Sequence, residues 1–432
     1  MTACDSKCIR GVYAEAARVS CRPMHIADRV AKMAESSTLA ATARGKALAA
    51  KGFPVLSLSA GEPDFATPAN IVEAAIDGLR RGLTHYAPTA GTADAREAVA
   101  RKLRDENGLA CEAAGTTITV GAKHAIFLAL QTLLEPGDEV LLPVPAWVSY
   151  APIVELAGGR VVEVPARPDR GYLVSAEDLE RAITSQTWAI VFNSPINPTG
   201  TMYSPDSIRE IAAMLARHRG IAIVADEIYE KLVYPEIDPA ASFLSIGACP
   251  EVAERTITVN GMSKAFAMTG WRIGYAAGVG EGAKAVREMI KLQGQMTNGI
   301  PTFCMPAIVE ALSNSADSIE SMRRSFAARA RIVAEGLGAI ADLTAPAPTS
   351  AFYAFIDLGR VLGRSSPGGR RIESPSAFCE ALLEESYVAA VPGEDFGGPG
   401  RTAFRISFAC AEQDLREALD RLRVFVENMS KA

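Results

Sequence analysis

The stretch that decides the fold runs from Thr116 to Pro143 and reads TTITVGAKHAIFLALQTLLEPGDEVLLP. The β-branched run at 116–120 and the apolar run at 139–143 predict two strands. Between them, residues 122–134 are rich in alanine and leucine over a helix-length segment, which predicts a helix. Strands separated by helices at this spacing indicate a largely parallel sheet with helices on both faces.

The same alternation continues as far as Gly278. The pattern is typical of an α/β core. Another helix-length segment stands at 204–218, and the further β-rich runs are 159–164, 188–193, 221–227, 256–261 and 273–278.

After about Ser313 the pattern changes. A long helix is predicted at 316–337, strands at 350–358 and 402–409, and a helix near 374–386. This order indicates a second, smaller α+β domain, joined by the segment 39–65. We therefore expect an extension and arm at 1–38, a large α/β domain at 69–315, and a small domain made of 39–68 and 316–432.

Composition argues against several classes of protein. The chain has 432 residues, 49% of them hydrophobic, and a net charge of −6 without a dense basic run, which argues against nucleic-acid binding. No uninterrupted apolar stretch approaches the roughly 18 residues of a membrane span. The eight cysteines are scattered without a C-x-x-C pair, so a reducing, cytoplasmic location fits best and no metal site is indicated. The first 24 residues are either a disordered arm or an organellar transit peptide.

Polar residues stand where several predicted strands end, which is where ligands bind in open parallel sheets. Lys264, which follows the run VNGMS, is a surface lysine, a buried ion-pair partner or a Schiff-base lysine. Burial and nearby positive charge lower the pKa of an amine and make it nucleophilic toward carbonyl groups. Arg272 and the glycines around it can form an anion site for the phosphate of an aldehyde cofactor.

Asp226 ends the run IAIVAD and precedes a segment that looks helical. It is either the N-cap of that helix or a carboxylate that binds a pyridinium nitrogen. Tyr229 would then point the same way as Asp226 across one helical turn. Asn197 lies in the loop FNSPINPTG, which is either a tight connection or a stiff support that aims the amide at a phenolate oxygen.

Three further positions are ambiguous when taken alone. Gly121 and Ala122 are either an ordinary strand-to-helix turn or a place where backbone amides hold phosphate. Trp147 is a core or surface tryptophan, or it stacks on a flat ring. Arg405 alternates with Ile406 along a predicted strand, so it is either solvated or the partner of a carboxylate.

One motif points to a different cofactor. GVGEGA, at residues 278–283, matches the G-x-G-x-x-A pattern of dinucleotide-binding turns between a strand and a helix. The acidic ribose partner expected about 20 residues further on is missing, because NGIPTFC occupies that stretch. A dehydrogenase is therefore disfavoured.

The motifs coincide in one order along the chain. Together they resemble the pyridoxal-phosphate aminotransferases of fold type I, class I, and in detail the bacterial-type aspartate aminotransferase branch. The resemblance covers nearly everything from about residue 28 to 425. The matching motifs are SAGEPDFATP (59–68), YAPTAGTADAREAVA (86–100), GAK (121–123), PAW (145–147), NPTG (197–200), DEIY (226–229), SKAFAMTGWRIG (263–274), VPGEDFG (391–397) and FRISFA (404–409).

The resemblance implies pyridoxal 5'-phosphate as cofactor and a role for each matching residue. Lys264 would be the Schiff-base lysine and general base, and Asp226 would pair with the pyridine nitrogen. A homodimer with shared active sites is also implied, with Tyr86 reaching the partner's phosphate. The remaining contacts would be Tyr229 and Asn197 at the ring oxygen, Trp147 against the ring, Arg272 with Gly121, Ala122 and Lys123 at the phosphate, and Gly61, Arg405, Trp147 and Asn197 around the substrate.

The implied activity is a ping-pong transfer of an amino group from an L-amino acid, with aspartate favoured, to 2-oxoglutarate. The alternatives are an aromatic, prephenate or alanine-type aminotransferase, a lyase with the same cofactor core, or a non-catalytic regulator. Departures from the family pattern bear on the substrate. Ala34 and Glu35 replace the arm's Lys-Pro, which puts dicarboxylate specificity in doubt, whereas Ser350 for glycine before AFY is expected to be a minor backbone change. The run 291–302 has Gly294, Met296, Asn298 and Gly299 where Ser, Ser, Ser and Pro are usual, and this less polar wall favours an aromatic or apolar side chain.

Overall fold

The computed structural model of the chain describes residues 24–31, 33 and 37–430. Nearly all of the N-terminal extension, together with Ala34 and Glu35, therefore lies outside the described residues. The chain divides into a short N-terminal unit, which carries the helix α2 (Asp28–Ala31), and a large unit that holds the rest.

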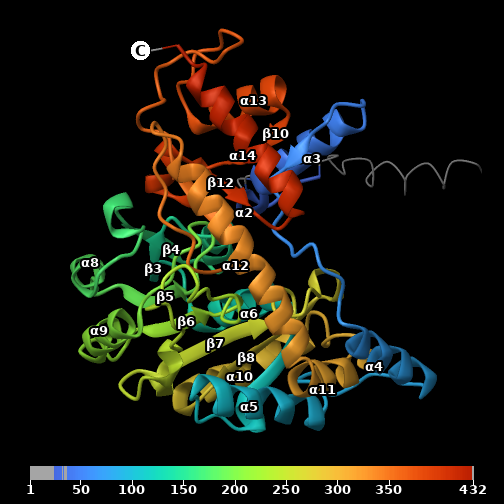
Figure 1. Cartoon of the computed structure of the whole chain (residues 1–432). Coiled ribbons are helices and arrows are strands. Elements are labelled where there is room, and N and C mark those ends of the chain that lie inside the picture. Colours follow the sequence, from blue (N-terminus) through green and yellow to red (C-terminus); the bar gives the residue numbers. More distant parts are fainter. Residues whose placement is uncertain (1–23, 32, 34–36, 431–432) are drawn as a thin grey trace, which may run out of the picture. The chain divides into compact units, whose positions relative to one another are not determined.

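A seven-stranded sheet lies at the centre of the large unit, in the strand order β2-β8-β7-β6-β5-β3-β4 (Figure 1). Strands β3 to β7 run parallel, and only β8 runs against the other strands of this sheet. The largely parallel α/β sheet predicted from the sequence is confirmed. The strands are β2 (Thr116–Val120), β3 (Glu139–Val144), β4 (Arg160–Pro165), β5 (Thr187–Asn193), β6 (Ala222–Asp226), β7 (Thr256–Gly261) and β8 (Ile273–Gly278).

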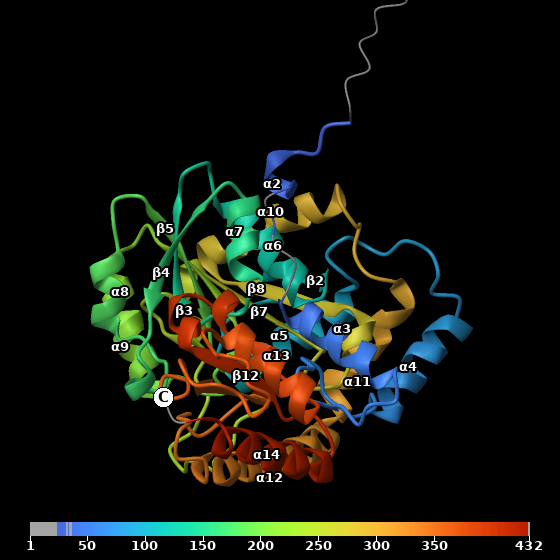
Figure 2. The same cartoon turned by 90° about the horizontal axis from the view of Figure 1, so that it is seen from above.

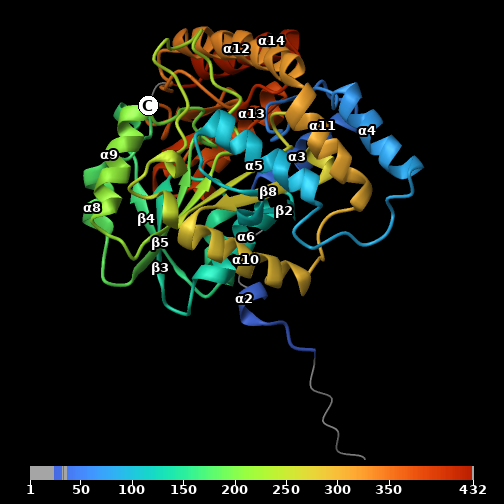
Figure 3. The same cartoon turned by 90° about the horizontal axis from the view of Figure 1, so that it is seen from below.

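Helices cover both faces of this sheet because both faces of its strands are apolar. In β6, Val224 packs on the side of α6 (Ala122–Leu133), α7 (Tyr150–Leu156) and α10 (Gly280–Gly294). Its neighbours Ile223 and Ala225 pack on the opposite side, against α8 (Ala176–Ala182) and α9 (Pro205–Ala216) (Figure 3). A third group of helices packs beside β2 and β8: α4 (Ala69–Arg80), α5 (Ala93–Asn107) and α11 (Met305–Asn314).

A second, antiparallel sheet in the order β11-β12-β9 belongs to the C-terminal part of the chain. It comprises β9 (Tyr353–Asp357), β11 (Val391–Pro392) and β12 (Ala403–Ser407), in which Arg405 pairs with Phe355. The short strand β1 (Leu56–Ser57) pairs in parallel with β10 (Val388–Ala389). This arrangement confirms the α+β character predicted for this region, whereas the division at residues 68 and 315 stays a prediction.

Four helices accompany the second sheet: α3 (Ser37–Ala49), α12 (Ala316–Gly338), α13 (Pro375–Ser386) and α14 (Glu412–Glu427). The two longest, α12 and α14, lie side by side (Figures 1 and 2) and share one buried cluster that includes Phe326 and Leu422. Among the described helices, none has the length and apolar character needed to cross a bilayer.

The glycines of the GVGEGA motif allow close backbone packing. Gly278 ends β8, and a Cβ placed there would lie 2.4 Å from the carbonyl carbon of Gly282. A Cβ on Gly282 would in turn lie 2.6 Å from the backbone oxygen of Thr256. These contacts pack the first turn of α10 onto β7 and β8, which accounts for the motif without a dinucleotide.

We expect Gly278→Ala to lower the free energy of unfolding by about 1–3 kcal/mol, because backbone atoms that cannot move independently surround the new methyl group. The measurement is urea denaturation followed by circular dichroism. Gly338→Ala is the matched control, since a Cβ there meets nothing within 4 Å. It should leave stability unchanged or raise it slightly. Equal stability of both variants would contradict the packing role of Gly278.

Candidate active site

The site forms where the parallel strands β5, β6 and β7 end, because their carboxyl ends meet at one edge of the sheet. Asn193 ends β5, and its amide donates to the backbone oxygen of Asp226, which ends β6, over 2.8 Å. The loop that carries Asn197 follows β5, and the turn that carries Lys264 follows β7. The adjacent strands thus bring together three of the predicted site residues.

Lys264 lies largely buried in this group. Its Nζ donates to the backbone oxygen of Gly61 and lies 5.9 Å from the ring centre of Tyr229. Burial, opposed by the charge of Glu62 and reinforced by those of Arg405 and Arg272, lowers the pKa of Lys264 to about 8. The surface-lysine interpretation is therefore wrong, and a substantial share of the amine is neutral near physiological pH.

Asp226 is 3% exposed and binds two donors. The Tyr150 hydroxyl donates to Oδ2 over 2.6 Å, and the backbone N–H of Ile228 donates to Oδ1 over 3.2 Å. Burial raises the pKa of Asp226, and these two hydrogen bonds oppose the shift. The residues after Asp226 form a turn, so the predicted helix and the N-cap interpretation are wrong.

Tyr229 lies between the end of β6 and the second sheet, and its phenol is within the electrostatic reach of Asp226. Its hydroxyl lies 3.1 Å from the hydroxyl of Tyr353 at the start of β9. The helical turn expected between Asp226 and Tyr229 is absent, because residues 228–231 form a turn, whereas a shared direction of the two side chains stays a prediction. Both tyrosines are buried, and burial raises the pKa of each phenol.

Arg405 is 1% exposed, so the solvated interpretation of its strand face is wrong. Its Nη1 donates to Oδ1 of Asn197 over 3.0 Å and its Nη2 to the backbone oxygen of Ser59 over 3.3 Å. The guanidinium lies 4.6 Å from the ring centre of Tyr353. No carboxylate of the described residues pairs with Arg405, and its buried Nε has no hydrogen-bond partner there. A buried arginine without a carboxylate partner in its own chain is suited to binding the carboxylate of a ligand.

Arg272 and the start of α6 form an anion cradle. Gly121 has a left-handed φ of 80°, and a Cβ there would lie 2.6 Å from Nη2 of Arg272. The next residue, Ala122, begins α6 and presents its backbone amide at the helix N-terminus. The Nζ of Lys123 lies 4.8 Å from the ring centre of Trp147, and burial together with the charge of Arg272 lowers the pKa of Lys123.

Trp147 is partly buried beside this cradle. Its ring meets that of Tyr150 edge-on, at 5.3 Å and 85°. Tyr86, by contrast, is 93% exposed, and the structure gives it no hydrogen bond with another described residue. Within one chain, therefore, the structure does not bring Tyr86 into the site.

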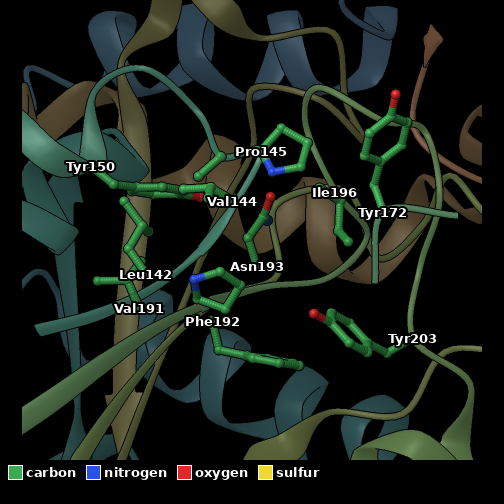
Figure 4. Close-up of a pocket in the computed structure, with 12 residues that line it drawn as sticks. Leu142, Val144, Pro145, Tyr150, Tyr172, Val191, Phe192, Asn193, Ile196 and Tyr203 are labelled. Atoms are coloured by element: carbon green, nitrogen blue, oxygen red, sulfur yellow. The ribbon is translucent and has the colours of Figure 1, made fainter. Parts of the chain in front are cut away.

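Sequence reasoning missed Tyr150, Tyr353 and Ser59. Tyr150 stands three residues after Trp147, but nothing in its local sequence shows that its hydroxyl reaches Asp226. Tyr353 belongs to the AFY motif, yet its partners Tyr229 and Arg405 are distant in sequence. Tyr150 also lines, with Asn193 and Tyr203, a cavity of about 20 Å³ (Figure 4). That volume is enough for about one water molecule, so this cavity is not the substrate site.

Comparison with known proteins decides the family. Residues 54–422 match the family model of aminotransferase class I and II. The chain belongs to this family. It is a transaminase. Solved structures of aspartate aminotransferases share its fold.

The similar proteins cover nearly the whole chain. The chain is 40% identical over 405 residues to an aspartate aminotransferase of Rhizobium meliloti (strain 1021), covering 94% of this chain and 97% of that protein. It is 39% identical to a probable aspartate/prephenate aminotransferase of Rhizobium leguminosarum bv. phaseoli, with 93% and 98% covered. The crystal structure of the Rhizobium meliloti aspartate aminotransferase superposes with a TM-score of 0.89 at 39% identity, covering 94% and 100% of the two chains.

We expect Lys264 of the cofactor-free protein to titrate near pH 8, more than two units below the ordinary lysine value of about 10.4. The measurement is an NMR pH titration of the lysine side chains, with Lys264→Met to assign the signal. Glu62→Gln should move the midpoint to lower pH, because it removes an opposing negative charge. Arg405→Gln should move it to higher pH. A midpoint above pH 10 in the wild type would contradict the burial of this amine.

Proposed function

We propose that this transaminase uses pyridoxal 5'-phosphate, and one observation carries the proposal. An amine with a lowered pKa, Lys264, lies within the electrostatic reach of both a buried carboxyl group, Asp226, and the arginine of an anion cradle, Arg272. The residues fit the cofactor's three polar ends. Asp226 suits a pyridine nitrogen, the Gly121 cradle suits a phosphate, and Lys264 suits an aldehyde.

When bound, pyridoxal phosphate supplies an aldehyde that takes up the amino group and a pyridinium ring that withdraws electrons from the substrate Cα. Asp226 would hold a proton at the ring nitrogen, and the Tyr150 hydroxyl and the Ile228 N–H fix the orientation of its carboxylate. Tyr229 and Asn197 would donate to the ring oxygen. Trp147 would pack against the ring.

Lys264 acts as the general base. Its Nζ takes the proton from the substrate Cα, and a pKa of about 8 suits a base that works near neutral pH. Arg405 would hold the α-carboxylate through its guanidinium, and Gly61, whose backbone oxygen accepts from Lys264, would complete that end of the site. The amino group would stay on the cofactor when water releases the first 2-oxo acid, and a second 2-oxo acid would then take it up, which predicts ping-pong kinetics.

We propose aspartate as the preferred donor and 2-oxoglutarate as the acceptor. The names of the relatives from Rhizobium support aspartate, and one of those names adds prephenate. Residues 291–302 bear on the alternative that the donor is an aromatic amino acid. Gln293 donates to the backbone oxygens of Thr89 and Ile118, whereas the Met296 side chain is 48% exposed and offers apolar surface.

The test of this function is the visible spectrum of the purified, cofactor-loaded protein. We expect aspartate to remove the absorption band and 2-oxoglutarate to restore it, with phenylalanine, tyrosine and alanine as competing donors. Lys264→Ala should abolish the band and essentially all turnover, because it removes both the attachment point and the base. Turnover near the wild-type rate in Lys264→Ala would exclude this mechanism, and release of ammonia without an oxo acid would indicate a lyase.

We also propose a homodimer in which each subunit completes the site of its partner. Tyr86 supports this, since a tyrosine that is 93% exposed in one chain gains from burial against a second chain. In such a dimer its hydroxyl would donate to the phosphate held in the partner's cradle. Two chains then share each active site.

A hybrid experiment tests the shared site. Homodimers of Lys264→Ala should have low activity. Homodimers of Tyr86→Ala should also have low activity when they are assayed at a physiological cofactor concentration. Mixed dimers should regain activity, because one of their two sites then combines a normal Lys264 with a normal Tyr86. The measurement is turnover after unfolding and refolding the two variants together, compared with each variant refolded alone. No gain on mixing would contradict a site shared between subunits.

A further inference from the structure

The loop that carries Asn197 is attached to the second sheet at Ser350. Ser350 is fully buried, and its hydroxyl lies 3.1 Å from the backbone oxygens of both Gly200 and Thr201. Its backbone N–H also donates to the oxygen of Gly200 over 2.9 Å. The side chain thus adds a connection that a glycine at this position would lack.

The same loop touches the second sheet at a further point. Gly200 has a left-handed φ of 70°, and a Cβ there would lie 2.0 Å from the backbone oxygen of Tyr353. Loop and strand are therefore in direct backbone contact. The loop is also closed on itself, because the N–H of Ile196 donates to the oxygen of Thr201 and the N–H of Gly200 to that of Ile196. A shift of residues 200–201 consequently moves the whole loop, including Asn197.

Residues 350–353 also support Arg405. In the antiparallel ladder β12 pairs with β9, and the Tyr353 ring lies 4.6 Å from the Arg405 guanidinium. Ala351 has an unusual left-handed φ of 52°, and its N–H donates to the oxygen of Leu232 over 2.8 Å. This segment is thus held firmly at the place where it meets the Asn197 loop.

We infer that the Ser350 hydroxyl is a positioning group that sets Asn197 at hydrogen-bond distance from Arg405. The inference rests on the proposed role of these two residues in holding the cofactor and the substrate carboxylate. Loss of the hydroxyl leaves neither carbonyl without a donor, because Gly200 keeps the N–H of Ser350 and Thr201 keeps the N–H of Ile196. The effect of its removal is therefore on loop position and mobility more than on stability.

The test compares Ser350→Ala with a matched loss of a buried hydroxyl. Ser366 is 4% exposed, and its hydroxyl donates to Glu385 in the C-terminal region. Hydrogen–deuterium exchange of the cofactor-free proteins should show residues 196–201 exchanging about two- to tenfold faster in Ser350→Ala than in the wild type. Ser366→Ala should leave these amides unchanged.

A binding measurement gives the second readout. The loaded Ser350→Ala protein should bind maleate, a dicarboxylate without an amino group, about two- to tenfold more weakly, and KM for 2-oxoglutarate should rise more than kcat falls. Ser350→Gly should show the same changes and replaces Ser350→Ala if that variant does not fold. Unchanged exchange and unchanged maleate affinity would overturn the inference, as would equal changes in Ser366→Ala. A wild type that fails to transaminate would refute the proposed function instead, while the exchange experiment would still test Ser350.

Discussion

The arrangement of the site depends on burying two cations, Lys264 and Arg405, within reach of each other's charge. Each loses hydration, and each disfavours the charge of the other, which is why burial and Arg405 both lower the pKa of Lys264. Arg405 remains charged under all physiological conditions, so Lys264 is the group that gives up its proton. A site with this surplus of positive charge favours ligands that carry anionic groups, such as a carboxylate or a phosphate.

Two separate sheets supply these groups, and their meeting fixes the distances. The parallel sheet provides Asp226, the Asn197 loop and the turn of Lys264, since its strands end at one edge. The antiparallel sheet provides Arg405 and Tyr353 through the ladder between β9 and β12. Hydrogen bonds cross between the sheets at Asn197 with Arg405 and at Tyr229 with Tyr353. The site therefore exists only where both sheets are correctly formed and in contact.

Local sequence predicted the strands well because their signal is local. The runs TTITV, TITVNG and IGYAAG became β2, β7 and β8 with the expected bounds, since β-branched and small apolar residues fit a sheet buried on both faces. The prediction of a helix after Asp226 was wrong because the structure of this segment is decided by contacts that are distant in sequence. Glu227 and Tyr229 bond there to Ser245 and Tyr353, which lie on different elements, and these tertiary bonds outweigh helical propensity.

The neighbours Asp226 and Glu227 show how two adjacent carboxyl groups come to play different parts. They point in different directions: Asp226 meets Tyr150, whereas Glu227 accepts from the Ser245 hydroxyl over 2.5 Å and from Asn107 over 3.4 Å. Burial and the charge of Glu230 raise the pKa of Glu227 to about 8, so it is mostly protonated at neutral pH. A second negative charge beside Asp226 would raise the pKa of Lys264 and keep that amine protonated. Because Glu227 is mostly neutral, Asp226 and Glu62 remain the nearby acids that oppose the low pKa of Lys264.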